Sequence, residues 1–309
     1  MEFKSKDIIS IRDFSKEDLL YILDISKKFE KDYDSNLLNG HILATLFFEP
    51  STRTRLSFSS AMSRLGGKVI GFDNPASTSV SKGESLLDTI KIVEGYSDII
   101  VMRHPIDGAA RFAAETAKIP IINAGDGVNQ HPTQTLLDLY TIQKSFGKLE
   151  NLNIGFVGDL KYGRTVHSLA HALSHFKAKM YFISPPQLKM PKDDLEQLDK
   201  EKIKYTEGKD LSKVANKLDI LYMTRIQKER FPDPIEYQKL KGCYRIDKTF
   251  LENTKKGLKV MHPLPRVDEL CSSCDGTEKA IYFEQAHNGV TVRMALLSLL
   301  LKKIKNERT

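Results

Sequence analysis

The sequence predicts an α/β protein made of two doubly wound parallel-sheet domains. Short apolar segments rich in β-branched and aromatic residues alternate with segments whose apolar residues recur at helical spacing. This alternation is typical of parallel sheets with helices on both faces. The pattern restarts after a polar stretch at residues 147–151. The chain of 309 residues is long enough for two domains of about 150 residues each.

The first half of the chain is expected to form the first sheet and its helices. Strands are predicted at residues 42–48, 68–72, 98–102 and 120–125, and helices after Ser15, after residue 51, after Ser85 and at residues 133–146. Ser15 and Asp18 have the spacing of a capping box, and apolar residues from Leu19 to Phe29 follow at roughly helical spacing. Residues 74–84 are polar and lack periodicity, so we expect a loop there.

The second half is expected to form a second sheet. Strands are predicted at residues 153–159, 180–183, 219–223 and 258–261, with a helix at residues 165–176, exposed helix and turns at 189–218, and a loop followed by a helix at 237–255. The closing helix, residues 290–304, is too apolar to stand free on the surface, so it should pack back on the first domain. We therefore expect a first domain at residues 1–148, completed by 288–309, a second domain at 149–287, and helices that join the two.

Composition favours a protein that handles small anions. The net charge is +7, but no block of Lys and Arg stands out as a nucleic-acid surface would. Three cysteines do not make the disulfide framework of a small secreted domain. Residues 1–7 lack an apolar signal core, and the apolar stretch near the C-terminus is too short to span a bilayer. We expect a cytoplasmic protein without nucleic-acid or membrane partners.

The turn at residues 51–55 is the first candidate ligand site. It joins a predicted strand to a helix, so backbone N–H groups and the helix dipole point out of it. Its side chains add the hydroxyls of Ser51, Thr52 and Thr54 and the guanidiniums of Arg53 and Arg55. Two arginines in a first turn oppose the dipole, which suits a bound phosphate. The alternative is a Ser or Thr cap on a basic surface helix.

Other polar residues follow neighbouring predicted strands. Arg103 comes after one buried strand, and His131 with Gln134 comes after the next. Ligands of parallel sheets bind at the carboxyl ends of strands. Taken singly, His131 would more often be structural and Arg103 a surface residue. Residues 153–159 do not contain a G-x-G-x-x-G fingerprint, so nothing there indicates NAD.

Four motifs, in order along the whole chain, resemble those of the aspartate/ornithine carbamoyltransferase family. They are S-T-R-T-R at residues 51–55, H-P-T-Q at 131–134, D-L-K-Y-G-R-T at 159–165 and H-P-L-P-R-V-D-E at 262–269. The last two resemble the aspartate branch, and in the fourth Pro263 replaces the cysteine of the ornithine branch. Outside these motifs, Arg225 stands where the ornithine branch has S-M-G. Arg164 and Arg225 suit a dicarboxylate, since a guanidinium binds a carboxylate bidentately. An ornithine enzyme and a non-catalytic anion-binding or assembly protein remain alternatives.

The resemblance implies that the α-amine of L-aspartate attacks carbamoyl phosphate, giving N-carbamoyl-L-aspartate and phosphate for pyrimidine biosynthesis. It also implies a role for each matching residue. Ser51, Thr52, Arg53 and Thr54 would hold the phosphate; Thr54, Arg103 and His131 would face the carbonyl oxygen; Gln134 and the backbone carbonyls around Leu264 and Pro265 would accept from the carbamoyl NH2; Arg164 would hold the α-carboxylate, and Arg225, oriented by Gln227, the β-carboxylate.

The resemblance further implies a homotrimer whose sites are shared between subunits. Lys82, with Ser79 in the same loop, would reach into a neighbour's site and bind aspartate. Neither cofactor nor metal is implied for this chain, although a zinc-bearing regulatory chain accompanies some family members and can make the assembly allosteric. Cys271 and Cys274 could be two ordinary thiols, a redox pair, or part of a zinc site that would also need Cys243 and His262.

Overall fold

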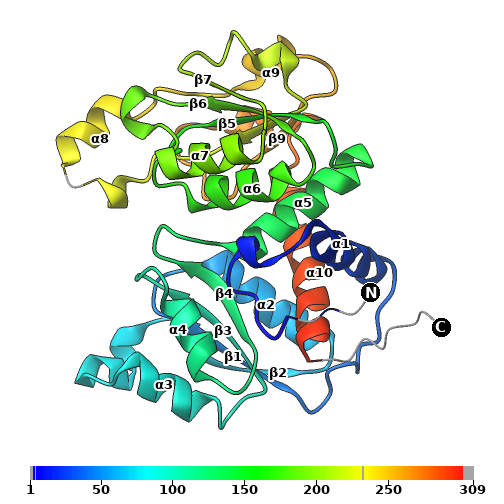
Figure 1. Cartoon of the computed structure of the whole chain (residues 1–309), viewed down its shortest axis with the longest axis vertical. Coiled ribbons are helices and arrows are strands. Elements are labelled where there is room, and N and C mark those ends of the chain that lie inside the picture. Colours follow the sequence, from blue (N-terminus) through cyan, green and yellow to red (C-terminus); the bar gives the residue numbers. More distant parts are fainter. Residues whose placement is uncertain (1–2, 4, 232, 302–309) are drawn as a thin grey trace. The chain divides into compact units, whose positions relative to one another are not determined.

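The computed structural model describes residues 3, 5–231 and 233–301. The chain divides into two compact units, residues 1–140 with 287–309 and residues 141–286. The boundaries fall inside two long helices, α5 (Pro132–Phe146) and α10 (Tyr282–Leu300). Each unit contains one parallel sheet with helices packed on it, as predicted (Figure 1).

The sheet of the first unit has the strand order β2-β1-β3-β4, and all its pairings are parallel. Its strands are β1 (Ile42–Phe47), β2 (Lys68–Phe72), β3 (Ile99–His104) and β4 (Ile121–Asp126). Every residue of β4 is buried, whereas the edge strand β2 has no buried residue. In the register Phe47 lies opposite Arg103, and His104 lies opposite Asp126. The carboxyl ends of β1, β3 and β4 therefore meet at one edge of the sheet.

The helices of the first unit are α1 (Lys16–Lys31), α2 (Thr52–Arg64), α3 (Leu86–Val93), α4 (Ala109–Thr116) and the unit's parts of α5 and α10. Among them, α1 and α3 begin at a serine whose side chain caps the helix. The capping box at α1 is confirmed, because the Ser15 hydroxyl accepts from the Asp18 N–H and the Asp18 carboxylate accepts from the Ser15 N–H. The sequence did not predict α4, which follows a left-handed Gly108 instead of a polar cap.

The segment at residues 74–84 is more ordered than the loop we expected. It contains two 3-10 turns, Pro75–Ser77 and Ser79–Lys82. The side chain of Asn74 accepts from the N–H of Ala76, and that of Thr78 from the N–H of Val80. Such short turns are held by local polar contacts and carry no apolar period, which is why a periodicity argument missed them.

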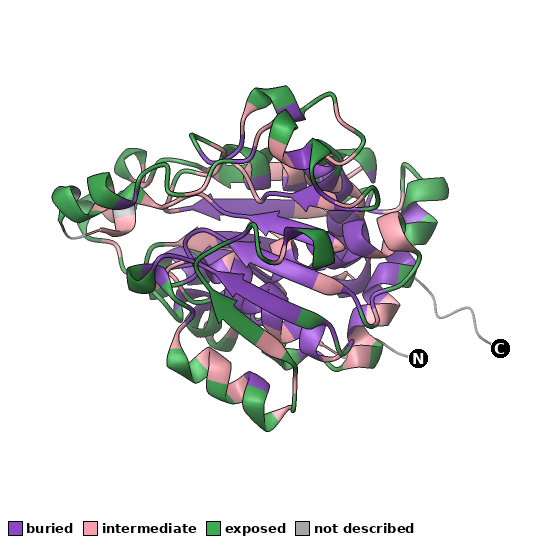
Figure 2. Cartoon of the chain, turned by 90° about the horizontal axis from the view of Figure 1, so that it is seen from above, coloured by how far each residue is buried: buried purple, intermediate pink, exposed green. Residues whose placement is uncertain are grey.

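The sheet of the second unit has the strand order β7-β6-β5-β8-β9, again wholly parallel. Its strands are β5 (Asn153–Val157), β6 (Lys179–Ile183), β7 (Tyr205–Gly208), β8 (Ile220–Met223) and β9 (Lys259–Met261), and its own helices are α6 (Arg164–Ser174), α7 (Lys192–Lys200), α8 (Pro234–Leu240) and α9 (Lys248–Glu252). The central strands are almost entirely buried (Figure 2).

Three predictions for the second unit need correction. β7 lies within the stretch predicted as helix and turns; it is a mostly exposed edge strand, so it has no buried apolar run. α8 lies partly within a predicted loop. α10 begins at Tyr282, eight residues earlier than predicted. Polar residues in its first turns interrupt the apolar pattern from which the helix was predicted. The predicted end of that helix, and the segment 302–309, lie outside the described residues.

The closing helix packs on the first unit, as predicted. From His287 onward α10 belongs to that unit, and Arg293 donates from Nη1 to the Ser57 hydroxyl of α2 over 2.8 Å. None of the helices in the described ranges is long and apolar enough to cross a membrane. Residues 1, 2 and 4, which belong to the stretch examined for a signal core, lie outside the description.

Candidate active site

The turn between β1 and α2 presents its polar groups outward. Ser51 is the N-cap of α2, yet its side chain makes no capping hydrogen bond to the helix. Thr52 and Arg53 are exposed, and Thr54 is buried at 7% exposure. The Ser51 hydroxyl is therefore not committed to the helix end, which disfavours the simple capping alternative and leaves the first-turn N–H groups facing outward.

Arg103 is held beside this turn. It stands near the end of β3, paired with Phe47 of β1. Its Nε lies 3.3 Å from a carboxylate oxygen of Glu49, and its Nη1 lies 3.4 Å from the Ser51 hydroxyl. Arg55 instead forms an ion pair of 2.6 Å with Asp73. The guanidinium that meets the Ser51 hydroxyl thus comes from a neighbouring strand rather than from the turn itself.

His131 and Gln134 open α5 at the end of β4. A cluster of hydrogen-bonded polar groups precedes them in the chain. The Asp126 carboxylate accepts hydrogen bonds from Asn123 Nδ2 at 2.8 Å and from the Gly108 N–H at 2.8 Å. His131 is 5% exposed, and its carbonyl accepts the N–H of Gln134 at 3.0 Å. We call the set Ser51, Thr52, Arg53, Thr54, Arg103, His131 and Gln134 the hydroxyl–arginine site; it belongs wholly to the first unit.

The second unit gathers two arginines at adjacent strand ends. Arg164, 9% exposed, is the first residue of α6 and follows β5, and Arg225 follows β8. The register of these paired strands puts Val157 opposite Met223, so the loops that carry the arginines start side by side. With Gln227 they form what we call the two-arginine site.

Asp159 ties these two loops together. Its carboxylate accepts the N–H of Tyr162 at 3.0 Å and the N–H of Gln227 at 3.4 Å. The Gln227 side chain donates from Nε2 to the Tyr162 carbonyl at 3.1 Å. Burial raises the pKa of Asp159, and the N–H donors of Tyr162 and Gln227 oppose that shift. These bonds fix the loop of Arg225 to the loop of Arg164.

The turn after β9 is shaped by a buried histidine. Leu264 adopts a left-handed conformation, with φ +53°, that non-glycine residues rarely adopt. His262 Nδ1 accepts the Leu264 N–H at 2.7 Å, and His262 Nε2 lies 2.9 Å from Glu269 Oε1. Since Nδ1 accepts, Nε2 carries the proton and donates to the Glu269 carboxylate. Burial raises the pKa of Glu269, whereas the hydrogen bond from His262 lowers it. The net result is a pKa below the ordinary value for a glutamate.

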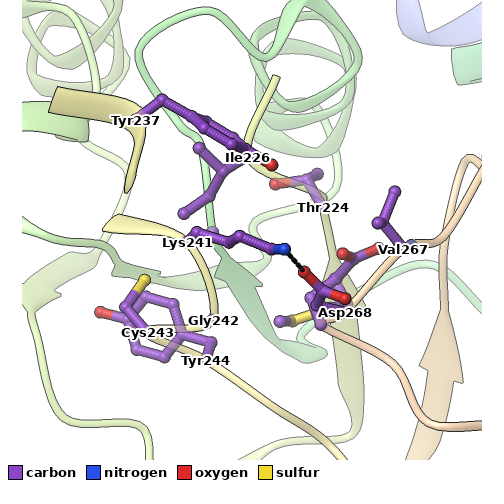
Figure 3. Close-up of a pocket in the computed structure, with 12 residues that line it drawn as sticks. Thr224, Ile226, Tyr237, Lys241, Gly242, Cys243, Tyr244, Val267 and Asp268 are labelled. Atoms are coloured by element: carbon purple, nitrogen blue, oxygen red, sulfur yellow. Dashed lines mark hydrogen bonds and ion pairs between the residues drawn. The ribbon is translucent and has the colours of Figure 1, made fainter. Parts of the chain in front are cut away.

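A hollow adjoins the loop of Arg225 within the second unit. It is partly open to solvent and is lined by residues from the β5 and β8 ends, from α8 with the turn after it, and from the turn after β9. Figure 3 shows the ion pair of Lys241 with Asp268 across it, at 3.3 Å. Thr224 and Ile226, which flank Arg225, contribute to its wall. This hollow was not predicted from the sequence.

Lys82 lies on a 3-10 turn of the first unit, and the three cysteines belong to the second unit. Lys82 is exposed at the end of its 3-10 turn, as is Ser79 at its start. All three cysteines are free thiols. Hydrogen bonds from Ser273 lower the pKa of Cys271 to about 7, whereas burial raises that of Cys274 to about 11. In the part of the chain that the structure describes, no three His, Cys, Asp or Glu side chains gather as metal ligands, so the zinc alternative has no support there.

Several residues that hold the candidate ligand-binding side chains and turns in place were not predicted from the sequence. They are Glu49, Asp138, Asp159, His262 and Glu269. Asp138 could have been found, because it stands four residues after Gln134 in a predicted helix and so on the same face. No such partner was predicted for Asp159 or His262, because the contact of Asp159 with Gln227 depends on the pairing of β5 with β8, and those of His262 depend on the conformation of the turn at residues 262–269.

Comparisons with known proteins agree along the whole chain. Residues 6–144 match the model of the aspartate/ornithine carbamoyltransferase carbamoyl-P binding domain, and residues 150–300 match that of the Asp/Orn binding domain. The aspartate carbamoyltransferase catalytic subunit of Thermococcus kodakarensis is 60% identical over 97% of this chain and 98% of its own length.

Solved structures give the same picture. The catalytic subunit of Methanocaldococcus jannaschii aspartate transcarbamoylase has a TM-score of 0.90 at 53% identity, covering 98% of this chain and 100% of that one. Trypanosoma cruzi aspartate transcarbamoylase, in complex with carbamoyl aspartate and phosphate, has a TM-score of 0.91 at 40% identity, covering 95% of each chain.

Proposed function

Because the chain belongs to the aspartate/ornithine carbamoyltransferase family, we propose that it transfers the carbamoyl group of carbamoyl phosphate to the α-amine of L-aspartate. The products are N-carbamoyl-L-aspartate and phosphate. The observation that carries this proposal is the two-arginine site, in which Arg164 and Arg225 stand at adjacent strand ends tied by Asp159. Two guanidiniums match the two carboxylates of aspartate.

The hydroxyl–arginine site is the proposed site for carbamoyl phosphate. Ser51, Thr52, Arg53 and Thr54 hold the phosphate through hydroxyls, a guanidinium and the first-turn N–H groups, as anions are held at helix N-termini. The Ser51 hydroxyl, which makes no capping bond to α2, and the exposure of Arg53 support this role. As the phosphate leaves, the same groups stabilise the charge it gains.

Catalysis in this proposal rests on position and charge. Carbamoyl phosphate is a mixed anhydride with a good leaving group, so the enzyme needs no side-chain nucleophile. The amine adds to the carbonyl, and Thr54, Arg103 and His131 stabilise the negative oxygen that forms. Glu49 and Ser51 contact the guanidinium of Arg103 and hold it in a fixed direction. Gln134 and the carbonyls around Leu264 and Pro265 accept hydrogen bonds from the carbamoyl NH2.

The aspartate branch is favoured over the ornithine branch by the charge of the second site. Gln227 is anchored to the carbonyl of Tyr162, which supports its proposed part in orienting Arg225 toward the β-carboxylate. Arg164 takes the α-carboxylate. A cationic ornithine side chain would meet Arg225 as a like charge, which disfavours binding. All three relatives named above are aspartate enzymes.

We further propose a homotrimer in which Lys82 completes a neighbour's aspartate site. Supporting this, large apolar side chains of the same unit are exposed: Leu56 of α2 is 55% exposed, and Ile70 of the edge strand β2, which leads into the loop of Lys82, is 41% exposed. Such side chains favour burial against a partner. The relatives from Thermococcus kodakarensis and Methanocaldococcus jannaschii are named catalytic subunits, which supports a separate regulatory chain as a partner to be sought by co-purification. The proposed setting is pyrimidine biosynthesis in the cytoplasm.

The test is an assay of the purified chain with carbamoyl phosphate and either L-aspartate or L-ornithine. We expect carbamoyl-aspartate with the first and no citrulline with the second. Product only with ornithine would assign the chain to the other branch. No product with either amine, in a folded chain that binds carbamoyl phosphate, would favour the non-catalytic alternative.

A further inference from the structure

Two opposite charges lie buried behind the hydroxyl–arginine site. Asp138 of α5 is 0% exposed, and Arg293 of α10 is 3% exposed. Charged side chains are almost never fully buried unless they are paired. The Asp138 carboxylate interacts electrostatically with the Arg293 guanidinium, so the two opposite charges compensate each other inside the first unit.

Arg293 has a prepared place in the core. Its Nη1 donates to the Ser57 hydroxyl at 2.8 Å, and its guanidinium lies 5.0 Å from the centroid of the Phe58 ring. A Cβ at position 289 would overlap Nη1 of Arg293, so Gly289 leaves the room that the guanidinium occupies. Burial lowers the pKa of Arg293 to about 10, while Asp138 raises it. The side chain is therefore a cation at neutral pH.

Asp138 connects this cation to a proposed ligand-binding residue. Gln134 donates from Nε2 to Asp138 Oδ1 at 2.9 Å. A carboxylate only accepts hydrogen bonds, so the NH2 end of the Gln134 amide must face Asp138. The Oε1 end is then the part of the amide left to meet a ligand. That end accepts hydrogen bonds and cannot donate them.

We propose that Asp138, anchored by Arg293, is a positioning residue that turns Gln134 so that the site selects an NH2-bearing carbamoyl group over an acyl group of the same size. The inference rests on the proposed function, because it takes Gln134 to face the carbamoyl NH2. Carbamoyl phosphate and acetyl phosphate differ there only in NH2 against CH3. A methyl group leaves the oriented Oε1 without a donor, and an unmatched buried acceptor costs binding free energy.

The most direct test compares two stable ligands, phosphonoacetamide and acetonylphosphonate, which differ only in that NH2 and CH3. Isothermal titration calorimetry on the full chain gives both dissociation constants. We expect the amide to bind at least about tenfold more tightly. Equal affinities in the wild-type chain would overturn the inference. Because this measurement involves no turnover, it stays separate from the activity assay, whose failure would strike the proposed function instead.

Asp138→Asn tests the orienting step at nearly constant shape. The cation of Arg293 attracts the Asn carbonyl oxygen and repels its NH2, so that NH2 turns toward Gln134. Gln134 then reverses and presents Nε2 to the ligand, where donor meets donor. We expect the preference for phosphonoacetamide to fall to within about threefold. A retained tenfold preference in a folded variant would refute the role of Asp138.

Ser57→Ala is the matched control, because it removes one hydrogen bond of Arg293 but leaves Asp138 and Gln134 unchanged. We expect it to keep the ligand preference, and an equal loss there would mean that the network is merely structural. Gly289→Ala provides a second route should Asp138→Asn fail to fold. Its Cβ displaces Arg293 while alanine favours the helix. We expect the preference to drop at least about threefold, and an unchanged preference would refute the role of Arg293.

Discussion

His262 offers the sharpest single test of how the turn after β9 is held. Its side chain is 1% exposed and makes two hydrogen bonds, to the Leu264 N–H and to the Glu269 carboxylate. His262→Phe removes both and leaves both partners without their bond to position 262. A lost neutral bond costs about 1–1.5 kcal/mol and one to a charged group about 1.5–3. We therefore expect His262→Phe to lose about 2.5–4.5 kcal/mol of unfolding free energy.

Two further variants separate the bonds. In His262→Asn the side-chain oxygen can replace Nδ1 as the acceptor for Leu264, whereas in His262→Gln the side-chain NH2 can replace Nε2 as the donor to Glu269. Urea unfolding gives stability, and steady-state kinetics give KM for carbamoyl phosphate. We expect His262→Asn to keep KM closest to wild type, because it preserves the bond that fixes Leu264. A His262→Phe chain with wild-type stability and KM would refute the reasoning.

Four other outcomes follow from the same geometry. Arg53→Ala should remove about 3–5 kcal/mol of transition-state stabilisation, seen as a fall in kcat, while Arg55→Ala, whose residue pairs with Asp73, should change kcat little. Arg164→Gln should raise KM for L-aspartate at least about tenfold without changing calorimetric binding of carbamoyl phosphate. The pKa of Glu269 is lowered on folding, so its ionised carboxylate stabilises the folded state at neutral pH. This stabilisation is lost as the pH falls through the lowered pKa, and Glu269→Gln should flatten this part of an acid-unfolding curve. Mixed trimers of Lys82→Ala and Arg53→Ala subunits should regain activity, and proper mixing without recovery would argue against shared sites.

The architecture could be predicted from the sequence because buried parallel strands are recognisable as apolar runs. The runs that became β1, β3, β4, β5 and β8 are almost entirely buried. The edge strand β7 and the short helix α4 escaped prediction, since one lacks a buried face and the other begins without a polar cap. Local pattern thus identifies most readily the strands that contain a buried apolar run.

The candidate site could be predicted only in part. Arg103 was expected at a strand end, and the structure brings it to Ser51. The partner Glu49 could not be foreseen, because that contact depends on the pairing of β1 with β3 across more than fifty residues of sequence. The burial of Arg293 behind Gln134 was hidden for the same reason, since α10 and α5 are far apart in the chain.

The measurement that tests the central claim most directly is product formation by the purified chain. Incubated with carbamoyl phosphate and L-aspartate, it should yield carbamoyl-aspartate and phosphate in equal amounts. Arg225→Gln, which removes one guanidinium of the two-arginine site, should lose most of that activity through KM for L-aspartate. Failure of the folded wild-type chain to form carbamoyl-aspartate, or full activity of Arg225→Gln, would contradict the assignment of the two sites.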